Sequence, residues 1–154
     1  MNFEFSVDQM QLKDIARKFL EKENAVKRAR NVLEGEESFD ENLWQQIIDL
    51  GFTATAIPEE YGGLGLGYLE LCVIAEELGR SLAPTPFSSS VYLATEAILN
   101  SEDDSLKQNY LPSLANGEKI GSFAHSESNT SPTESNIQCN VSGNALSGKK
   151  IAVV

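Results

Sequence analysis

A glycine-rich loop that leads directly into an apolar segment constrains this sequence most. The run from Ile57 to Gly67 holds four glycines, and residues 68–80 follow it. Glycine accepts positive φ angles and lets backbones approach closely, at an entropic cost that a mere connector need not incur. Apolar residues of the following segment recur at helical spacing, so we predict a central helix that its neighbours cover on most sides. Gly79 is predicted to cap its C-terminus.

The sequence before the loop predicts two helical regions. Ser6 with Gln9 three residues later forms a capping-box pattern, and we expect the helix that follows to turn one apolar side inward; its members are Val7, Met10, Ile15, Phe19 and Val26. This region is also the most basic of the chain, which indicates a solvated face with acidic partners.

The second helix of this half is predicted to start at Asp40 as N-cap and to end at Gly51. Trp44 lies on its apolar side and is predicted to be a core residue rather than a cofactor stacker.

Two further helices are expected after the central one. Pro84 and Pro86 mark a turn before an apolar helix over residues 91–99. Ser101–Asp104 supply capping groups for a last helix, and Pro112 must lie near an end or a bend of it because proline lacks the N–H donor.

The composition changes at Lys119, where Ser, Asn and Gly become frequent and helical periodicity disappears. Alternation over residues 137–142 predicts a half-buried strand, Gly143-Asn144 suits a two-residue hairpin turn, and Lys150–Val154 is predicted to begin another strand. We therefore expect a helical domain over residues 1–118 and the incomplete beginning of a β-barrel-like domain over 119–154. The last strand would leave an open edge, so we expect either a fragment of a longer protein or completion by another chain.

Charge and composition exclude several classes of function. A net charge of −11 argues against nucleic acid or an anionic membrane as partner. Apolar runs fall short of the roughly 20 residues of a membrane span, and the first residues lack the pattern of a signal peptide. Cys72 and Cys139 have no metal-type spacing and His125 is the single histidine, so no metal site is predicted. These features favour a cytoplasmic protein with reduced thiols.

Several of these segments together carry a family resemblance. The run IPEEYGGLGLG, the helix that ends in AEELGR, and the sequence Pro84-x-Pro86-Phe87 are similar to the N-terminal helical domain of flavin-dependent acyl-CoA dehydrogenases. Three other segments agree in order and spacing: Phe5-x-x-x-Gln9-x-x-Leu12, Trp44 followed by Leu50-Gly51-Phe52, and Tyr110-Leu111-Pro112 followed by Gly117-Glu118. The resemblance covers residues 3 to about 127 and implies a mainly α fold, a helical bundle followed by the first strands of a β domain.

The resemblance also implies an activity and a cofactor site. Members of this family remove a proton from Cα and a hydride from Cβ of an acyl-CoA thioester, with FAD as the hydride acceptor. Residues 123–127 take the place of the first strand of the flavin-binding domain, which makes Phe123, His125 and Ser126 the candidate cofactor-binding residues. Ser128 stands where proline is usual, residues 129–133 hold no Gly-Ser pair, and Ala152 falls where a flavin-flanking tryptophan is usual.

Two interpretations follow from the resemblance. In the first, the chain is the N-terminal part of an FAD-dependent acyl-CoA dehydrogenase and is inactive alone, because the family's carboxylate base comes from a later helical domain; no catalytic residue is assigned here. In the second, it belongs to a subunit that has lost flavin binding and supports a catalytic partner. The implied partners are acyl-CoA, other dehydrogenase-like subunits in a homo- or hetero-oligomer, and an electron-transfer flavoprotein.

The glycine loop and the glutamate pairs leave narrower questions. The loop lacks the G-x-G-x-x-G spacing, because Tyr68 and Glu70 stand where a third glycine would be required. It either packs tightly beside the helices or lines an acyl or flavin cavity. The pairs Glu59-Glu60 and Glu76-Glu77 are predicted to be surface charges or caps, since carboxylates adjacent in sequence point in different directions on a helix.

Overall fold

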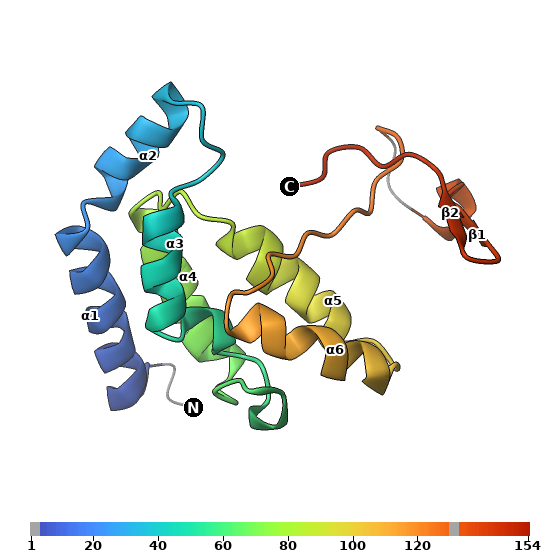
Figure 1. Cartoon of the computed structure of the whole chain (residues 1–154). Coiled ribbons are helices and arrows are strands. Elements are labelled where there is room, and N and C mark those ends of the chain that lie inside the picture. Colours follow the sequence, from blue (N-terminus) through green and yellow to red (C-terminus); the bar gives the residue numbers. More distant parts are fainter. Residues whose placement is uncertain (1–3, 130–132) are drawn as a thin grey trace.

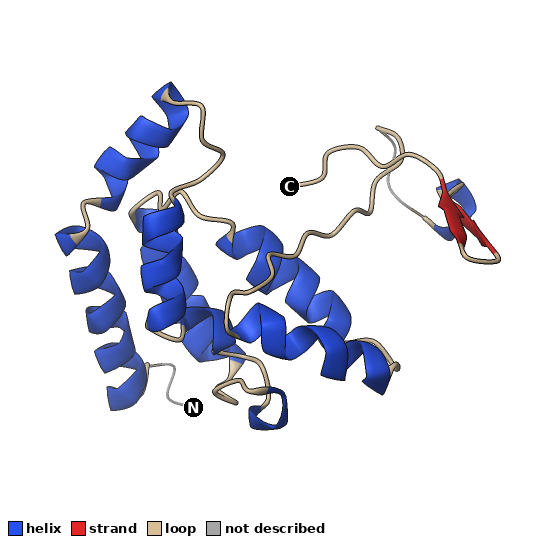
Figure 2. Ribbon diagram, viewed as in Figure 1, coloured by secondary structure: helices blue, strands red, loops and turns tan. Residues whose placement is uncertain are grey.

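The computed structural model describes residues 4–129 and 133–154 and shows a helical bundle from which a long C-terminal arm extends to a small hairpin (Figure 1). The α-helices are α1 (Val7–Lys22), α2 (Ala25–Glu34), α3 (Glu41–Asp49), α4 (Tyr68–Arg80), α5 (Glu96–Leu99) and α6 (Asp104–Ala115). Short 3₁₀ turns are η1 (Phe52–Ala54), η2 (Glu59–Tyr61) and η4 (Glu134–Asn136), and η3 (Ser88–Thr95) is a π-helix. The strands are β1 (Asn140–Ser142) and β2 (Ala145–Ser147). The mainly α fold predicted from the sequence is confirmed, with strands confined to the C-terminal arm (Figure 2).

Helix α1 starts as predicted, but its buried side differs from the prediction. The Ser6–Gln9 capping box is formed in both directions. The helix packs along α4 through a stripe that includes the buried residues Ala16 and Leu20, with Phe19 beside them. The other residues predicted to face inward are exposed, namely Val7, Met10, Ile15 and Val26. Polar contacts set the side of α1 that faces α4, because Lys13 and Arg17 pair with Glu76 and Glu77 of that helix.

Helices α1 and α2 are separate because Asn24 adopts a left-handed conformation with φ of 53°. Helix α2 consequently leaves the direction of α1 and projects beyond the main bundle (Figure 1). Val26 lies after this break, so the single helical period assumed from the sequence does not apply to it.

Helix α3 agrees with the sequence at each of its predicted points. The Asp40 carboxylate accepts a hydrogen bond from Leu43 N at 2.8 Å, and Gly51 follows the helix with φ of 76°. Trp44 is buried and meets the Phe87 ring edge to face at 6.4 Å between centroids. Trp44 is therefore a core residue, as predicted.

Helix α4 is the central helix of the bundle and spans the predicted segment up to Arg80. Its buried residues are Leu71, Val73, Ile74, Glu77 and Leu78, while Leu69 and Cys72 are exposed. The helix continues through Gly79 to Arg80, so the predicted cap at Gly79 is wrong. Leu82 takes the left-handed conformation instead, with φ of 50°, and Ala83 N donates to Leu78 O at 3.0 Å. That bond closes a helix end of the Schellman type without glycine.

The segment after the proline turn forms the π-helix η3, which continues into α5. Thr95 is buried, and its hydroxyl donates to Ser90 O at 2.8 Å, five residues earlier. Asp103 caps α6 through Leu106 N at 3.1 Å, and Pro112 lies in the last turn of that helix, as the sequence requires.

Two hydrophobic clusters hold the bundle together. The larger joins α1, α3, α4 and η3 and includes Leu20, Leu43, Trp44, Ile47 and Phe87. The smaller joins η1, the glycine loop and α6 and includes Ala54, Ile57, Leu111, Leu114 and Ala115. No helix of the described ranges 4–129 and 133–154 is both long and apolar enough to traverse a lipid bilayer.

The C-terminal arm contains less strand than predicted. Strands β1 and β2 pair antiparallel across Gly143-Asn144, which confirms the two-residue turn. The strand expected over residues 137–142 is limited to Asn140–Ser142 and is exposed rather than half-buried. The strand expected at Lys150–Val154 is not formed, and Ala152 has a left-handed φ of 51°. A hairpin of three-residue strands offers no core face, so the apolar residues near it find nothing to pack against.

Candidate functional site

The connector from Lys119 to Glu127 carries all the predicted site residues and leaves the bundle along η3. Gly121 N donates to Oγ of the buried Ser90 at 3.2 Å. A Cβ atom at Gly121 would overlap the Cβ of Ala94, so glycine is what allows the connector to lie directly on η3. This contact fixes the direction in which the connector continues towards Phe123.

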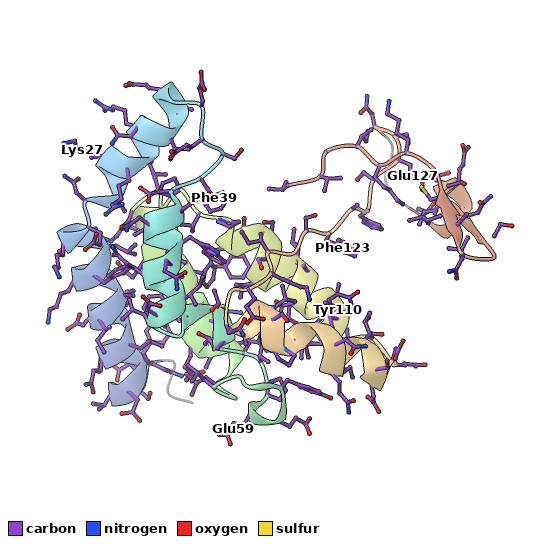
Figure 3. All side chains as sticks on the ribbon, in the orientation of Figure 1. Lys27, Phe39, Glu59, Tyr110, Phe123 and Glu127 are labelled. Atoms are coloured by element: carbon purple, nitrogen blue, oxygen red, sulfur yellow. The ribbon has the colours of Figure 1, made fainter. Side chains whose placement is uncertain are left out.

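Phe123 and His125 lie next to each other on the connector with their rings tilted by 37° and 5.5 Å between centroids. The Phe123 side chain is 43% exposed. It borders a mostly apolar pocket of about 290 Å³, whose other walls come from the helices and include Ala94, Ile98, Tyr110 and Leu114. Figure 3 labels Phe123 on the connector beside the bundle and Tyr110 on α6. The ring therefore lies where the helical bundle and the arm meet.

Ser126 and His125 are held through their backbone rather than through their side chains. Ile151 N donates to Ser126 O at 2.8 Å, and Lys150 Nζ donates to His125 O at 3.2 Å. These two bonds bring residues 25 positions apart side by side. The His125 ring and the Ser126 hydroxyl remain outside these bonds.

Both oxygens of the Glu127 carboxylate accept hydrogen bonds within the arm. Its Oε2 accepts from Gln138 N at 2.6 Å, and its Oε1 accepts from Cys139 N at 2.9 Å and from Lys150 Nζ at 2.8 Å. Hydrogen bonds from the Cys139 thiol, from Lys150 and from Gln138 N hold the pKa of the Glu127 carboxyl at about 2. The same thiol bond raises the pKa of Cys139, which keeps this thiol protonated at neutral pH.

A polar pocket of about 530 Å³ opens on the hairpin side of Glu127. Its walls include Ser135, Gln138, Asn140, Ser147 and Lys149. Gly148 has φ of 152°, and a Cβ at this residue would overlap the Cys139 sulfur. Gly148 and Cys139 therefore pack closely, and both line the pocket.

The glycine loop folds back on the segment that precedes it. Leu64 N donates to Ala54 O and Leu66 N donates to Thr55 O, each at 2.9 Å. A Cβ at Gly63 would overlap the carbonyl oxygen of Ile57. These contacts favour the tight-packing interpretation, with glycine required by the close backbone approach at Gly63.

Glu77 differs from the prediction that it is a surface charge or a cap. Its side chain is fully buried, and Arg17 of α1 binds it in bidentate fashion, with 2.6 Å and 3.0 Å between nitrogen and oxygen. Arg80 Nε donates a further bond to Glu77 at 2.8 Å, and Arg80 Nη2 donates to Glu21 at 3.1 Å. The hydrogen bonds from Arg17, and then those from Arg80, lower the pKa of Glu77 to about 2. Its adjacent residue Glu76 is exposed and pairs with Lys13, as a surface charge does.

The residues present fit one flank of a flavin ring system. An exposed aromatic face at Phe123, a second ring at His125 and a hydroxyl at Ser126 are a chemically suitable set for a flat, partly apolar heterocycle with polar edges. The opposite flank is not matched in the same way, because Ala152 is exposed, left-handed and carries only a methyl group. The positions 130–132, which include part of the segment lacking Gly-Ser, lie outside the described residues. Within the described ranges, no cluster of three or more His, Cys, Asp or Glu side chains is arranged for a metal ion.

Sequence reasoning missed three residues that shape this site. Gly121 gave a weak signal, as an isolated glycine in a connector. Gln138 and Lys150 fall in predicted strands, but that pattern gave no sign of their role, because the role depends on a pairing of distant segments.

Comparisons with known proteins agree on one family. The sequence profile of the acyl-CoA dehydrogenase N-terminal domain matches residues 6–118. Isovaleryl-CoA dehydrogenase from Arabidopsis thaliana is 32% identical over 155 aligned residues, which cover 96% of this chain and 37% of that relative. Isovaleryl-CoA dehydrogenase from Solanum tuberosum is 34% identical over 118 residues, which cover 73% of this chain and 29% of the relative. The chain thus spans about a third of the length of these relatives.

Solved structures show the same fold. A chain from the structure of the electron transferring flavoprotein of Acidaminococcus fermentans superposes with a TM-score of 0.83 and 29% identity, over 99% of this chain and 41% of that one. A chain of the ChsE4–ChsE5 complex of Mycobacterium tuberculosis gives a TM-score of 0.75 and 29% identity, over 83% and 35% of the two chains. The acyl-CoA dehydrogenase of Bacillus anthracis complexed with FAD gives 0.73 and 27%, over 82% and 22%. On this evidence the chain belongs to the acyl-CoA dehydrogenase family, whose N-terminal domain it contains.

Proposed function

We propose that this chain is the N-terminal part of an FAD-dependent acyl-CoA dehydrogenase and that it supplies one wall of the thioester site. The observation that carries the proposal is the meeting of an apolar pocket with an exposed aromatic segment at Phe123. The family match over residues 6–118 supports it. The division into a helical domain over 1–118 and the start of a β domain over 119–154 belongs to the same proposal.

In this proposal each part of the chain has a separate role. The pocket between η3, α6 and the connector would hold apolar groups of the acyl chain away from water. Phe123, His125 and Ser126 would hold the flavin, which supplies the hydride-accepting chemistry when it is bound. We assign no catalytic residue to this chain, since no carboxylate of the described residues lines the apolar pocket beside Phe123. The chain alone is therefore expected to be inactive.

The experiment that tests this proposal is a flavin titration. The purified 154-residue chain is mixed with FAD, passed through a desalting column and examined by visible absorption and flavin fluorescence. Retained flavin that a Ser126→Ala, Phe123→Ala double variant fails to retain would support the assignment. A Tyr61→Phe variant, altered in the glycine-loop region, serves as the control. Equal retention by the double variant would place any flavin elsewhere.

A second candidate function has one observation in its favour. Ala152 presents no ring where relatives of this kind are expected to flank the flavin, and its backbone is left-handed. The similar ChsE4–ChsE5 structure is a complex, and another similar structure, the Tcur3481–Tcur3483 steroid acyl-CoA dehydrogenase, carries two protein names. The alternative is a subunit that does not bind FAD and supports a catalytic partner. A folded chain that gains flavin only when a partner dehydrogenase subunit is added would favour this alternative; an electron-transfer flavoprotein would serve either assembly as electron acceptor.

A further inference from the structure

We propose that Glu127 is a positioning residue, whose carboxylate fixes the Phe123–Ser126 segment relative to the hairpin and so sets where the two aromatic rings stand. The inference rests on the proposed function of that segment and identifies what holds it in place. Figure 3 shows Glu127 next to the hairpin and Phe123 nearer the bundle, at the two ends of this segment.

Both oxygens of Glu127 are engaged by groups from two different segments. Gln138 N and Cys139 N, at 2.6 Å and 2.9 Å, belong to the residues that lead into β1. Lys150 Nζ, at 2.8 Å, comes from the segment after β2. The Glu127 side chain is 11% exposed and that of Lys150 is 24% exposed. Charge-assisted bonds of this length are about twice as strong as neutral ones, and partial burial limits their screening by salt.

Lys150 extends the effect of Glu127 to the site itself. The same ammonium group that binds Glu127 also donates to His125 O at 3.2 Å. The next residue, Ile151, donates to Ser126 O at 2.8 Å. The position of His125 and Ser126 therefore depends on Lys150 and Ile151, and the position of Lys150 depends on Glu127.

The arrangement leaves the functional side chains free. Every bond from Lys150 and Ile151 to the segment uses a backbone carbonyl, so the His125 ring and the Ser126 hydroxyl keep their capacity to bind a ligand. If Glu127 only held the hairpin in place, its bonds to Gln138 N and Cys139 N would be sufficient. The additional bonds to His125 and Ser126 are what make Glu127 a positioning residue.

Glu127→Gln in the full 154-residue chain tests the inference, with Glu118→Gln as the matched control. Glu118 is an exposed carboxylate immediately before the connector. Two NMR readouts do not require FAD: the hydrogen-exchange rates of the Gln138 and Cys139 amides, and the nuclear Overhauser effects between the Phe123 and His125 rings. We expect Glu127→Gln to accelerate exchange at both amides about tenfold or more and to remove the ring-to-ring effects, while Glu118→Gln changes neither. Unchanged circular dichroism of the helices shows that the bundle remains folded.

Lys150→Met separates the positioning of His125 and Ser126 from the hydrogen bonds that Glu127 accepts from Gln138 and Cys139. This variant keeps the bonds of Glu127 to Gln138 N and Cys139 N but loses the bond to His125 O. We expect slow amide exchange to persist while the ring-to-ring effects weaken and FAD affinity falls about tenfold.

Two outcomes would overturn the inference, and a third would contradict only the proposed function. Persistent ring contacts in both variants would show that Glu127 only holds the hairpin residues Gln138 and Cys139 in place. Unchanged amide exchange in Glu127→Gln would show that the carboxylate bonds do not exist in solution. A wild-type chain that shows the ring contacts but retains no FAD would contradict the proposed function of the segment and leave the positioning role supported.

Discussion

The bundle and the C-terminal arm each contain a carboxylate with a pKa of about 2, and the two carboxylates work in opposite surroundings. Glu77 is fully buried between two arginines and joins α1 to α4 inside a large hydrophobic cluster. Glu127 lies in an arm where β1 and β2 are exposed along their whole length. In the bundle the ion pair adds to order that hydrophobic burial already provides. In the arm, polar contacts are the main source of order.

The bundle and the arm should therefore respond differently to the loss of apolar contacts and of carboxylates. Losing apolar contact should unfold the bundle, whereas it should hardly affect the hairpin, which buries little. Losing a carboxylate should affect both regions, through global unfolding in the first and through local opening in the second. Substitutions of the same type in the two regions therefore test this contrast.

The largest contrast is expected from truncation of apolar side chains. Ile47 is fully buried in the larger cluster, so Ile47→Ala should lower the free energy of unfolding by about 2–5 kcal/mol. Leu146 in β2 is 77% exposed, and Leu146→Ala should change it by less than about 0.5 kcal/mol. Urea unfolding followed by circular dichroism at the helix band measures both. A large effect at Leu146 would mean that the arm packs on the bundle, against the comparison.

A slightly smaller contrast is expected between adjacent glutamates of α4. Glu77→Gln removes the charge that Arg17 and Arg80 share and should cost about 1.5–3 kcal/mol, because a buried carboxylate loses its charge-assisted hydrogen bonds to two half-exposed arginines. Glu76→Gln removes an exposed pair with Lys13 and should cost less than about 1 kcal/mol. The two variants differ by one position in the same helix, so helix propensity cancels in the comparison. Similar losses for both in thermal or urea unfolding would show that burial of Glu77 adds nothing.

Acidification should affect both regions, but the quantity that falls differs. In the bundle it is the free energy of unfolding, and in the arm it is the protection of backbone amides. The pKa of Glu77 falls from its ordinary value of 4.5 to about 2 on folding, so its contribution is fully present above about pH 5 and is lost as the pH falls towards 2. The difference in unfolding free energy between wild type and Glu77→Gln should shrink over this window. The pKa of Glu127 is depressed in the same direction, so protection of the Gln138 and Cys139 amides should also decline there. Unfolding titrations and amide exchange between pH 5 and pH 2.5 measure the two effects, and a difference that grows on acidification would contradict the assignment.

The extent to which these regions follow from the sequence differs for a physical reason. Bundle features with local causes were predictable: the Ser6 capping box, the Asp40 cap and the burial of Trp44 each depend on residues a few positions apart. The inward face of α1 was not, because it depends on the pairing of Lys13 and Arg17 with residues of α4 more than 50 positions away. Local hydrogen bonds are recorded in sequence spacing, whereas the rotation of a packed helix is decided by its partner.

The arm shows the same limit more strongly. The two-residue turn at Gly143-Asn144 was predictable from residue type. The loss of the strand at Lys150–Val154 was not, because Lys150 and Ile151 pair with the connector instead of a strand. Family resemblance located Phe123, His125 and Ser126, but it gave no indication that Glu127 and Lys150 connect them. Contacts between segments more than 20 residues apart are invisible to periodicity, and here they hold the candidate site.

The last pair of variants tests the boundary between the two regions. The sign of the change in unfolding free energy is what distinguishes them. A Cβ at Gly121 would overlap Ala94, so Gly121→Ala should push the connector off η3 and cost about 1–3 kcal/mol. Gly79 has open space where its Cβ would lie and is inside α4, so Gly79→Ala should stabilise the chain by about 0.5–1 kcal/mol. Thermal unfolding of the two variants gives the signs, and the hydrogen bond from the amide of residue 121 to Ser90 Oγ, read from the amide resonance of residue 121, should be lost only in the first. If Gly121→Ala were also stabilising, the connector would not rest on η3 at this residue.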